Sequence, residues 1–342
     1  MLLNADTIFD VDFNRMVEYH KSHGGLVTIF THPNSHPYDS SLIIVDKDKS
    51  VRSWIEKEKE RPLYYNNRVN AGIHIIDPAV LDMVDIDPER IGNIDETTGK
   101  IIKVDLDRQL LKPLQGTGKM FCYDSPEYVK DMGTPERFYS VAENFKAGII
   151  QAKNMINKQK AVFLDRDGTI NRYKGFLKNI DDFELIPGVT DAIKKLNSSG
   201  YLVIVITNQP VVARGEVTFE ELEEIHKKME TLLGLEGAYI DGLYFCPHHP
   251  NKGYEGEIAQ LKFDCDCRKP KPGMLLKAAK DFNIDLSQSF MVGDSENDVK
   301  AGIAAGCRSV LISGEVANHN KEGNFGQTYT VSSLLEFVDN YL

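Results

Sequence analysis

A run of apolar residues leads directly into a pair of aspartates near the middle of the chain. Ala161 to Leu164 are followed by Asp165, Arg166 and Asp167, and then by Gly-Thr. A short apolar run that ends in turn residues is typical of a buried parallel strand, and open α/β sheets bind ligands in the loops after such strands. Two carboxylates there suit a hard cation and acid–base chemistry, although an acidic turn that only ends a strand has the same pattern.

From residue 161 onward, apolar strand patterns alternate with amphipathic helix patterns. Pro187 and Gly200 flank the first of the expected helices, as is typical of helix ends. Alternating strands and helices predict a doubly wound parallel sheet. We expect strands at 161–164, 201–207, 243–245, 290–294 and 309–312, and helices at 189–199, 218–233, 273–282, 295–305 and 331–342.

Three of these strands end in polar clusters, which a parallel sheet brings to one edge. The clusters are Asp165–Asp167, Thr207–Gln209 and Gly293–Asp294, and a later loop contains Arg268 and Lys269. Phosphoryl transfer uses this set of groups: a nucleophile, carboxylates for a metal, and cationic or hydroxyl donors for the phosphoryl oxygens. Each residue alone is more often a cap, a solvated charge or a packed side chain, so the prediction rests on the combination.

Four residues of the types that bind zinc occur as two close pairs. Cys246 and His248 form one pair, and Cys265 and Cys267 form the other. Three thiolates and one imidazole make a closed tetrahedral set, which predicts a structural Zn²⁺ rather than a catalytic one. His249 is the alternative imidazole ligand. We expect the ion to hold the segment between the two pairs beside the active site.

The length and composition limit the number of domains, the kinds of binding partner and the cellular compartment. The chain of 342 residues is long enough for two domains, and its net charge of −11 argues against a nucleic-acid-binding surface. No apolar run approaches the ~20 residues of a membrane helix, and the first residues lack the basic region of a secretory signal. The odd, clustered set of cysteines favours a reduced compartment, so we expect a cytoplasmic protein with Cys122 and Cys307 in hydrophobic cores.

Residues 1–148 have the pattern of a mixed α/β domain. A polar turn at 46–49 predicts a hairpin between strands 42–45 and 51–55. Residues 149–160 are expected to form a helical, charged linker, as the end of a helix that begins near Phe138, and 161–342 form the second domain. The other expected elements are strands at 2–6, 26–30 and 69–76 and helices at 13–23 and 105–114.

The polar clusters of the second domain resemble the four motifs of the haloacid dehalogenase (HAD) phosphatase superfamily. The motifs are Asp165-x-Asp167-Gly-Thr, Thr207-Asn208, Lys269, and Gly293-Asp294 with Asp298. The segments at 212–215, 246–250 and 265–270 further resemble the heptose bisphosphate phosphatases, and the histidinol phosphate phosphatases share most of them. The resemblance covers 161 to about 312 and implies a Rossmann-like α/β fold.

This resemblance implies a role for each motif residue. Asp165 is the nucleophile that forms an aspartyl-phosphate, and Asp167 is the general acid and base. Mg²⁺ is held by Asp165, by the main-chain carbonyl of Asp167 and by Asp294, whereas Asp298 lies behind these ligands or, alternatively, is an outer ligand. The residues implied to hold the phosphoryl group and the rest of the substrate are Thr207, Lys269, Asn208, Arg214 and, at the distal charged end, Arg268.

One loop departs from the pattern of this superfamily. Pro210 and Val211 stand where Ser-Gly usually follows Thr-Asn-Gln. Proline removes a backbone N–H and fixes φ, and valine is stiffer than glycine. We therefore expect an effect on the substrate contacts of this loop more than on catalysis.

The first domain resembles sugar-phosphate nucleotidyltransferases, above all the mannose- and heptose-1-phosphate guanylyltransferases. The matching segments are 4–7, 56–59, 69–73 and 130–136. In this resemblance Asp6 and Asp131 hold a catalytic Mg²⁺, and Asn70 with Lys57 or Lys59 contacts a sugar phosphate. No Gly-rich nucleotide loop precedes Asp6.

Three interpretations of the first domain remain: a fragment of a longer bifunctional protein, a degenerate domain kept for packing or sugar binding, or an active transferase. An incomplete sheet exposes apolar edges, so we expect a partner or self-association to cover them.

The two resemblances together imply an enzyme that acts on a small sugar phosphate. The expected reaction is Mg²⁺-dependent removal of the C7 phosphate of a heptose 1,7-bisphosphate, within nucleotide-activated heptose biosynthesis for surface polysaccharide. The alternatives are a bifunctional phosphatase and guanylyltransferase, and a histidinol phosphate phosphatase. No nucleic acid or membrane partner is expected.

Overall fold

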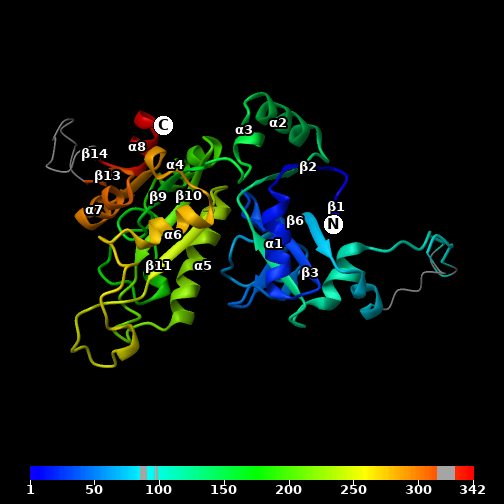
Figure 1. The fold of residues 1–342 in the computed structure, drawn as a ribbon, viewed down its shortest axis with the longest axis horizontal. Helices are drawn as coiled ribbons and strands as arrows, with labels where there is room; N and C mark the ends of the chain where they lie inside the picture. Colours follow the sequence, from blue (N-terminus) through cyan, green and yellow to red (C-terminus); the bar gives the residue numbers. More distant parts are fainter. Residues whose placement is uncertain (85–90, 96, 98, 314–327) are drawn as a thin grey trace.

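The computed structural model describes residues 1–84, 91–95, 97, 99–313 and 328–342. Figure 1 shows two lobes, one built from the blue and cyan first part of the chain and the other from the green to red second part. Each lobe contains its own sheet. No helix in the described part of the chain combines the length and the apolar character that crossing a membrane requires.

The first domain contains a mixed sheet with the strand order β5-β4-β6-β3-β7, and β1 also pairs with β6. Strand β7 runs parallel to β3, whereas the other pairs are antiparallel. The predicted hairpin is confirmed, because Leu42 of β4 pairs with Ile55 of β5. The strands are β1 (Leu2–Leu3), β3 (Val27–His32), β4 (Leu42–Val45), β5 (Val51–Ile55), β6 (Val69–Ile76) and β7 (Met120–Asp124), and β2 (Thr7–Asp10) and β8 (Tyr128–Asp131) form a separate antiparallel pair.

Helix α1 (Phe13–His23) forms as the sequence predicts. The side chain of Asp12 accepts a hydrogen bond from the backbone N–H of Asn14 and so caps its start, and Gly24 ends it in a left-handed conformation. Met16 on its inner face is fully buried. The helix expected at 105–114 is irregular: Leu106–Leu111 is a π-helix, and a 3₁₀ turn follows that contains Pro113, which lacks a backbone N–H.

The prediction of a continuous helix from 138 to about 160 is wrong. Helix α2 (Pro135–Lys146) ends before Gly148, which has φ +72°, and only the short helix α3 (Ile149–Ala152) follows. The side-chain amide of Gln159 then donates to three main-chain carbonyls between residues 152 and 157. The expected last helical turns are therefore absent, and this segment is instead a turn whose carbonyls accept hydrogen bonds from the buried Gln159 side chain.

The second domain contains a parallel sheet with the strand order β11-β10-β9-β12-β13-β14. The apolar run at the start of the second domain forms its central strand β9, which pairs with β10 and β12. The strands are β9 (Lys160–Leu164), β10 (Tyr201–Asn208), β11 (Gly242–Cys246), β12 (Phe290–Gly293), β13 (Arg308–Ile312) and β14 (Thr328–Val331).

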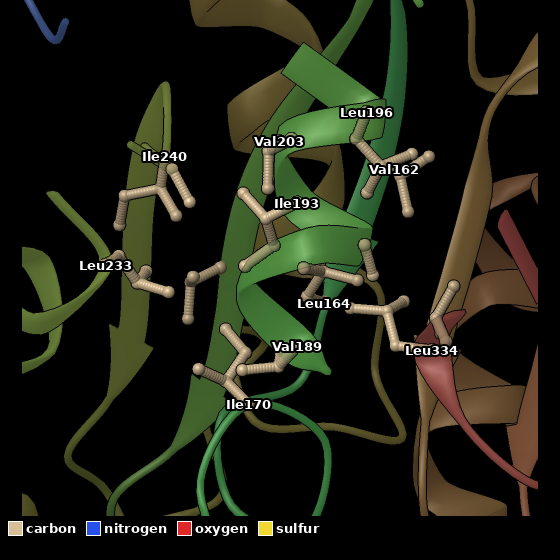
Figure 2. Close-up of a cluster of buried hydrophobic side chains, with 14 of the residues drawn as sticks. Val162, Leu164, Ile170, Val189, Ile193, Leu196, Val203, Leu233, Ile240 and Leu334 are labelled. Atoms are coloured by element: carbon tan, nitrogen blue, oxygen red, sulfur yellow. The ribbon is translucent and has the colours of Figure 1, made fainter. Parts of the chain in front are cut away.

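Helices cover both faces of this sheet, which confirms the doubly wound prediction. One face packs under α4 (Val189–Ser198), α5 (Phe219–Leu235) and α8 (Leu334–Tyr341), and Figure 2 shows the buried core between them and the strands. The other face packs under α6 (Gly273–Asp281) and α7 (Glu296–Ala305). Cys307 lies in this second core and Cys122 in a core of the first domain, as predicted.

The predicted start of the last helix is wrong. Val331 is the final residue of β14 and pairs with Ile312, and α8 begins at Leu334. The side chain of Ser333 caps the helix by accepting a hydrogen bond from the N–H of Glu336. Strand β14 consists of β-branched and aromatic residues, which are typical of strands, but the helical pattern concealed it.

The two domains meet through polar contacts on α5. The carboxylate of Glu230 accepts hydrogen bonds from the side chain of Asn66 (2.9 Å) and from the backbone N–H of Asn67 (2.7 Å). Thr231 exchanges hydrogen bonds with both backbone groups of Tyr65. Pro37 packs against Gly234, where an added Cβ would lie 2.5 Å from the proline ring.

Candidate active site

The three polar clusters meet at the carboxyl edge of the central strands. Asp165 follows β9, Thr207 is the second-last residue of β10, and Asp294 follows β12, whose neighbour is β9. Gly168 has φ +85°, and a Cβ at this position would lie 1.9 Å from a carboxylate oxygen of Asp294. Only glycine lets the loop after β9 approach Asp294 this closely.

A buried lysine links the acidic groups of this edge. The amine of Lys269 contacts a carboxylate oxygen of Asp165 at 2.8 Å, one of Asp298 at 2.6 Å, and donates to the main-chain carbonyl of Ile206 at 2.7 Å. Oxygen atoms of Asp165, Asp294 and Asp298 lie within 4.8 Å of one another. One cation thus faces three carboxylates, and a divalent cation fits the remaining negative charge.

Burial shifts the titration of these carboxylates. Desolvation raises the pKa of Asp165 to about 7, although Lys269 acts in the opposite direction. Desolvation and the neighbouring Asp298 raise the pKa of Asp294 to about 6. A bound metal ion would lower the pKa of these carboxylates, because its positive charge favours their ionised form.

Asp298 is held by contacts with Ser295 and Lys269, behind the candidate metal ligands. One of its oxygens accepts hydrogen bonds from the backbone and the hydroxyl of Ser295, in the capping box of α7, and the other contacts Lys269. It is fully buried, and a Cβ on Gly293 would collide with it at 2.4 Å. Of the two roles expected for Asp298, these contacts favour that of a residue behind the ligands.

Asp167 accepts hydrogen bonds on both carboxylate oxygens from residues to which the sequence analysis gave no role. The fully buried guanidinium of Arg166 contacts it at 2.9 and 3.0 Å, the amide of Asn171 at 3.0 Å, and the amide of Gln209 at 2.8 Å. The same Gln209 amide donates to the hydroxyl of Thr207. The only sequence signal for Arg166 is its place between the two aspartates.

The other candidate substrate residues differ in what they contact. Asn208 uses its side-chain amide to exchange two 3.0 Å hydrogen bonds with the main chain of Lys269, so it positions that lysine. Arg268 donates to the main-chain carbonyl of His248 at 3.3 Å. Arg214 is buried between the rings of Phe176 and Tyr254.

The loop that departs from the superfamily pattern, at Pro210 and Val211, is held in place by packing. Val211 is 1% exposed and lies in a small apolar cluster with Val217 and Leu222. Pro210 keeps its carbonyl, which accepts a hydrogen bond from the N–H of Arg214. The valine that replaces a glycine therefore serves as a core residue beneath the loop.

Cys246, His248, Cys265 and Cys267 form one cluster. The three sulfur atoms lie 3.1 to 3.4 Å apart, and Nδ1 of His248 lies 3.2 Å from Cys267 and 3.7 Å from Cys246. Tetrahedral zinc with bonds of about 2.3 Å places its ligands roughly 3.8 Å apart, so a small expansion admits the ion. His249, the alternative ligand, instead accepts a hydrogen bond from the N–H of Asn251.

The nucleotidyltransferase-like residues of the first domain lie around a single cavity of about 880 Å³ between the two domains. Asp6, Asn70 and Asp131 line it, and the lining includes Lys57 but not Lys59 among the described residues. Asp131 forms a two-point contact with Arg137 at 2.7 and 2.8 Å. The second domain closes the cavity with residues such as Lys194, Tyr239 and Asp241.

Two family models match the chain. A nucleotidyl transferase model matches residues 1–148, and a HAD-hydrolase-like model matches residues 266–337. The solved structure of D,D-heptose 1,7-bisphosphate phosphatase from B. bronchiseptica, complexed with magnesium and phosphate, is 33% identical, with a TM-score of 0.45, and covers 53% of this chain and 97% of that chain.

Curated relatives match about half of this chain and almost all of their own length. D-glycero-beta-D-manno-heptose-1,7-bisphosphate 7-phosphatase from Yersinia pestis is 38% identical over 182 residues, which are 53% of this chain and 95% of the relative. The protein of the same name from Haemophilus influenzae is 41% identical and matches over 52% of this chain and 94% of the relative. Through its second domain, the chain therefore belongs to the D-glycero-beta-D-manno-heptose-1,7-bisphosphate 7-phosphatase family of HAD-like hydrolases.

Proposed function

We propose that the second domain hydrolyses the C7 phosphate of D-glycero-D-manno-heptose 1,7-bisphosphate. The observation that carries this proposal is the contact of Lys269 with Asp165, at the centre of a carboxylate cluster that follows β9 and β12. A nucleophile, a phosphate-binding cation and metal ligands thus lie within one site. The names of the relatives supply the substrate.

Asp165 attacks phosphorus and forms an aspartyl-phosphate, while the C7 oxygen of the sugar leaves. Asp167 gives that oxygen a proton and then takes one from the water that hydrolyses the aspartyl-phosphate, so inorganic phosphate is released and Asp165 is restored. The donors around Asp167 hold its carboxylate in place for both transfers. Lys269 and Thr207 hold the phosphoryl oxygens.

Asp165, Asp294 and the main-chain carbonyl of Asp167 would hold Mg²⁺. The excess of carboxylates over lysines at this site supports that fit. The ion would neutralise charge on the phosphoryl group and the nucleophile. The Cys246, His248, Cys265 and Cys267 cluster would hold a structural Zn²⁺.

Turnover on two substrates tests this function. We expect kcat/KM for heptose 1,7-bisphosphate to exceed that for histidinol phosphate by about 10²-fold or more. Equal turnover, or a preference for histidinol phosphate, would reject the heptose assignment while leaving a phosphatase.

A second function is favoured for the first domain, namely binding of a sugar 1-phosphate in the cavity between the domains. Asp6, Asn70 and Asp131 line this cavity, and the amine of Lys130 in its wall contacts Ser140 and forms no ion pair within the described residues. Calorimetric titration of mannose 1-phosphate tests binding. Formation of a sugar nucleotide from GTP separates simple binding from transferase activity.

The fusion of the two domains supports a place in nucleotide-activated heptose biosynthesis for surface polysaccharide. A sugar 1-phosphate is what remains when the C7 phosphate has been removed, and it is also what a guanylyltransferase-like domain accepts. We place the protein in the cytoplasm, where nucleotide sugars are made. We also propose that a partner chain or a second copy covers Leu2 and Leu3, which are exposed on β1.

A further inference from the structure

The side-chain amide of Asn70, in the wall of the cavity between the domains, has one end bound and one end free. Its oxygen accepts a hydrogen bond from the backbone N–H of Gly72 at 3.1 Å and lies 3.2 Å from Nε2 of His74. Its nitrogen has no hydrogen-bond partner within the described residues and is not enclosed by protein. Because Asn70 lines the cavity, this nitrogen is a donor that a ligand can reach.

A bulge in β6 brings His74 to Asn70. Ile29 of β3 pairs with His74, so a regular antiparallel register would pair Thr31 with the residue two positions before His74. Instead Thr31 pairs with Asn70. Residues four apart in a regular strand are separated by about 13 Å, far beyond hydrogen-bond distance. Gly72, with φ +77°, bends the chain between them, and bulges of this kind re-aim side chains next to functional sites.

The chemistry of the two neighbours fixes which way the amide faces. A backbone N–H can only donate, so the Asn70 atom that faces Gly72 is the oxygen. Burial lowers the pKa of His74 to about 4, so its fully buried ring is neutral at pH 7 and carries a single N–H. That N–H is on Nε2, which faces an acceptor, whereas Nδ1 has no hydrogen-bond partner in the described part of the chain. His74 therefore donates to the oxygen and leaves the nitrogen of Asn70 for the cavity.

A donor held in this way suits the oxygen atoms of a phosphorylated sugar. Hydroxyl and phosphate oxygens accept hydrogen bonds from an amide, and the same cavity wall contains the amine of Lys130. An amide that is already oriented loses less conformational entropy when the ligand binds. The opposite orientation would present the carbonyl oxygen of Asn70, which repels a phosphate oxygen.

We propose that His74 is a positioning residue, which holds the amide of Asn70 as a hydrogen-bond donor to an oxygen of a sugar phosphate between the domains. The proposal rests on the binding function proposed above for the first domain. It adds the residue that decides whether this wall of the cavity donates or accepts a hydrogen bond.

Calorimetric titration of the full chain with mannose 1-phosphate tests the proposal through a double-mutant cycle. His74→Leu removes the N–H and lets the amide turn, so we expect the dissociation constant to rise about 10-fold. His74→Gln supplies an amide N–H near the place of Nε2 and should keep the dissociation constant within about 3-fold of the wild-type value. In an Asn70→Ala background, His74→Leu should have no further effect, because His74 acts through Asn70.

A second variant tests the donor without changing His74. Asn70→Asp keeps an oxygen for Gly72 and His74 but replaces the free nitrogen with a carboxylate oxygen. We expect its dissociation constant to rise at least about 10-fold. Wild-type affinity in Asn70→Asp would refute the donor role, whether or not the His74 variants fold.

Ile73→Val, at a buried neighbour in the same strand, is the matched control for loss of packing and should leave the dissociation constant unchanged. The melting temperature of each variant reports the fold. Unchanged affinity in His74→Leu, or a further loss when His74→Leu is added to Asn70→Ala, would overturn the positioning role alone. Failure of the wild-type protein to bind mannose 1-phosphate would instead reject the binding function of the first domain, and the positioning role with it.

Discussion

The two domains contain similar acidic residues next to strands, but their sites are built differently. In the second domain, Asp165 and Asp298 contact one lysine, and Asp167 is held by surrounding donors. In the first domain, Asp6 and Asp131 line an open cavity of about 880 Å³, and Asp131 contacts Arg137.

The comparison shows that motif residues alone do not define a catalytic site. A phosphoryl-transfer site needs groups that are held at fixed positions by other groups, and the second domain provides them. The first domain places its motif residues around a space that suits binding.

Removal of the nucleophile should have the largest effect. Asp165→Asn keeps the size of the side chain but loses nucleophilic attack, so kcat for phosphate release should fall by about 10⁴-fold or more. Asp131→Asn, at the matching place in the first domain, should leave kcat within about 2-fold. A comparable loss in both variants would show that the two sites work as one.

Loss of a zinc ligand should destabilise the second domain. Cys265→Ser should abolish bound zinc and cost at least about 3 kcal/mol, equivalent to roughly 6–12 °C in melting temperature. Elemental analysis and calorimetry measure both effects. Cys307→Ala, at a buried cysteine outside the cluster, should retain zinc; an unchanged melting temperature in Cys265→Ser would refute the structural role.

Acid should destabilise the first domain through His74. This side chain is fully buried, and desolvation lowers its pKa to about 4. In the unfolded chain the pKa of a histidine is near 6.5, so protonation at lower pH favours the unfolded state. The stabilisation that neutral His74 gives the folded state is therefore complete above pH 6.5 and falls by about 3 kcal/mol as the pH drops to 4. Urea unfolding followed by Trp54, the only tryptophan of the chain, should show a weaker pH dependence in His74→Phe. Identical slopes in both proteins would contradict this.

The sequence was sufficient for the parts of the fold and site that depend on local pattern. The alternation of strand and helix predicted the parallel sheet, and the two pairs of cysteine and histidine predicted the four-residue cluster. Long-range satisfaction of polar groups was not predictable. Gln159 ends the linker helix through three carbonyls, and Arg166 and Gln209 hold Asp167, yet no local pattern encodes these contacts.

The irregular segments were missed for related reasons. Val331 has the apolar character of both a helix and an edge strand, and only its pairing with Ile312 decides between them. The partnership of Arg214 with Phe176 and Tyr254 joins three segments, so it required the structure.

The contact between the domains has a consequence for how the second domain can be engineered. Glu230 and Thr231 meet the first domain through hydrogen bonds, and the same side chains on α5 can bind water when that domain is absent. The phosphatase portion can be transplanted to another partner without exposing a new apolar face along these two residues.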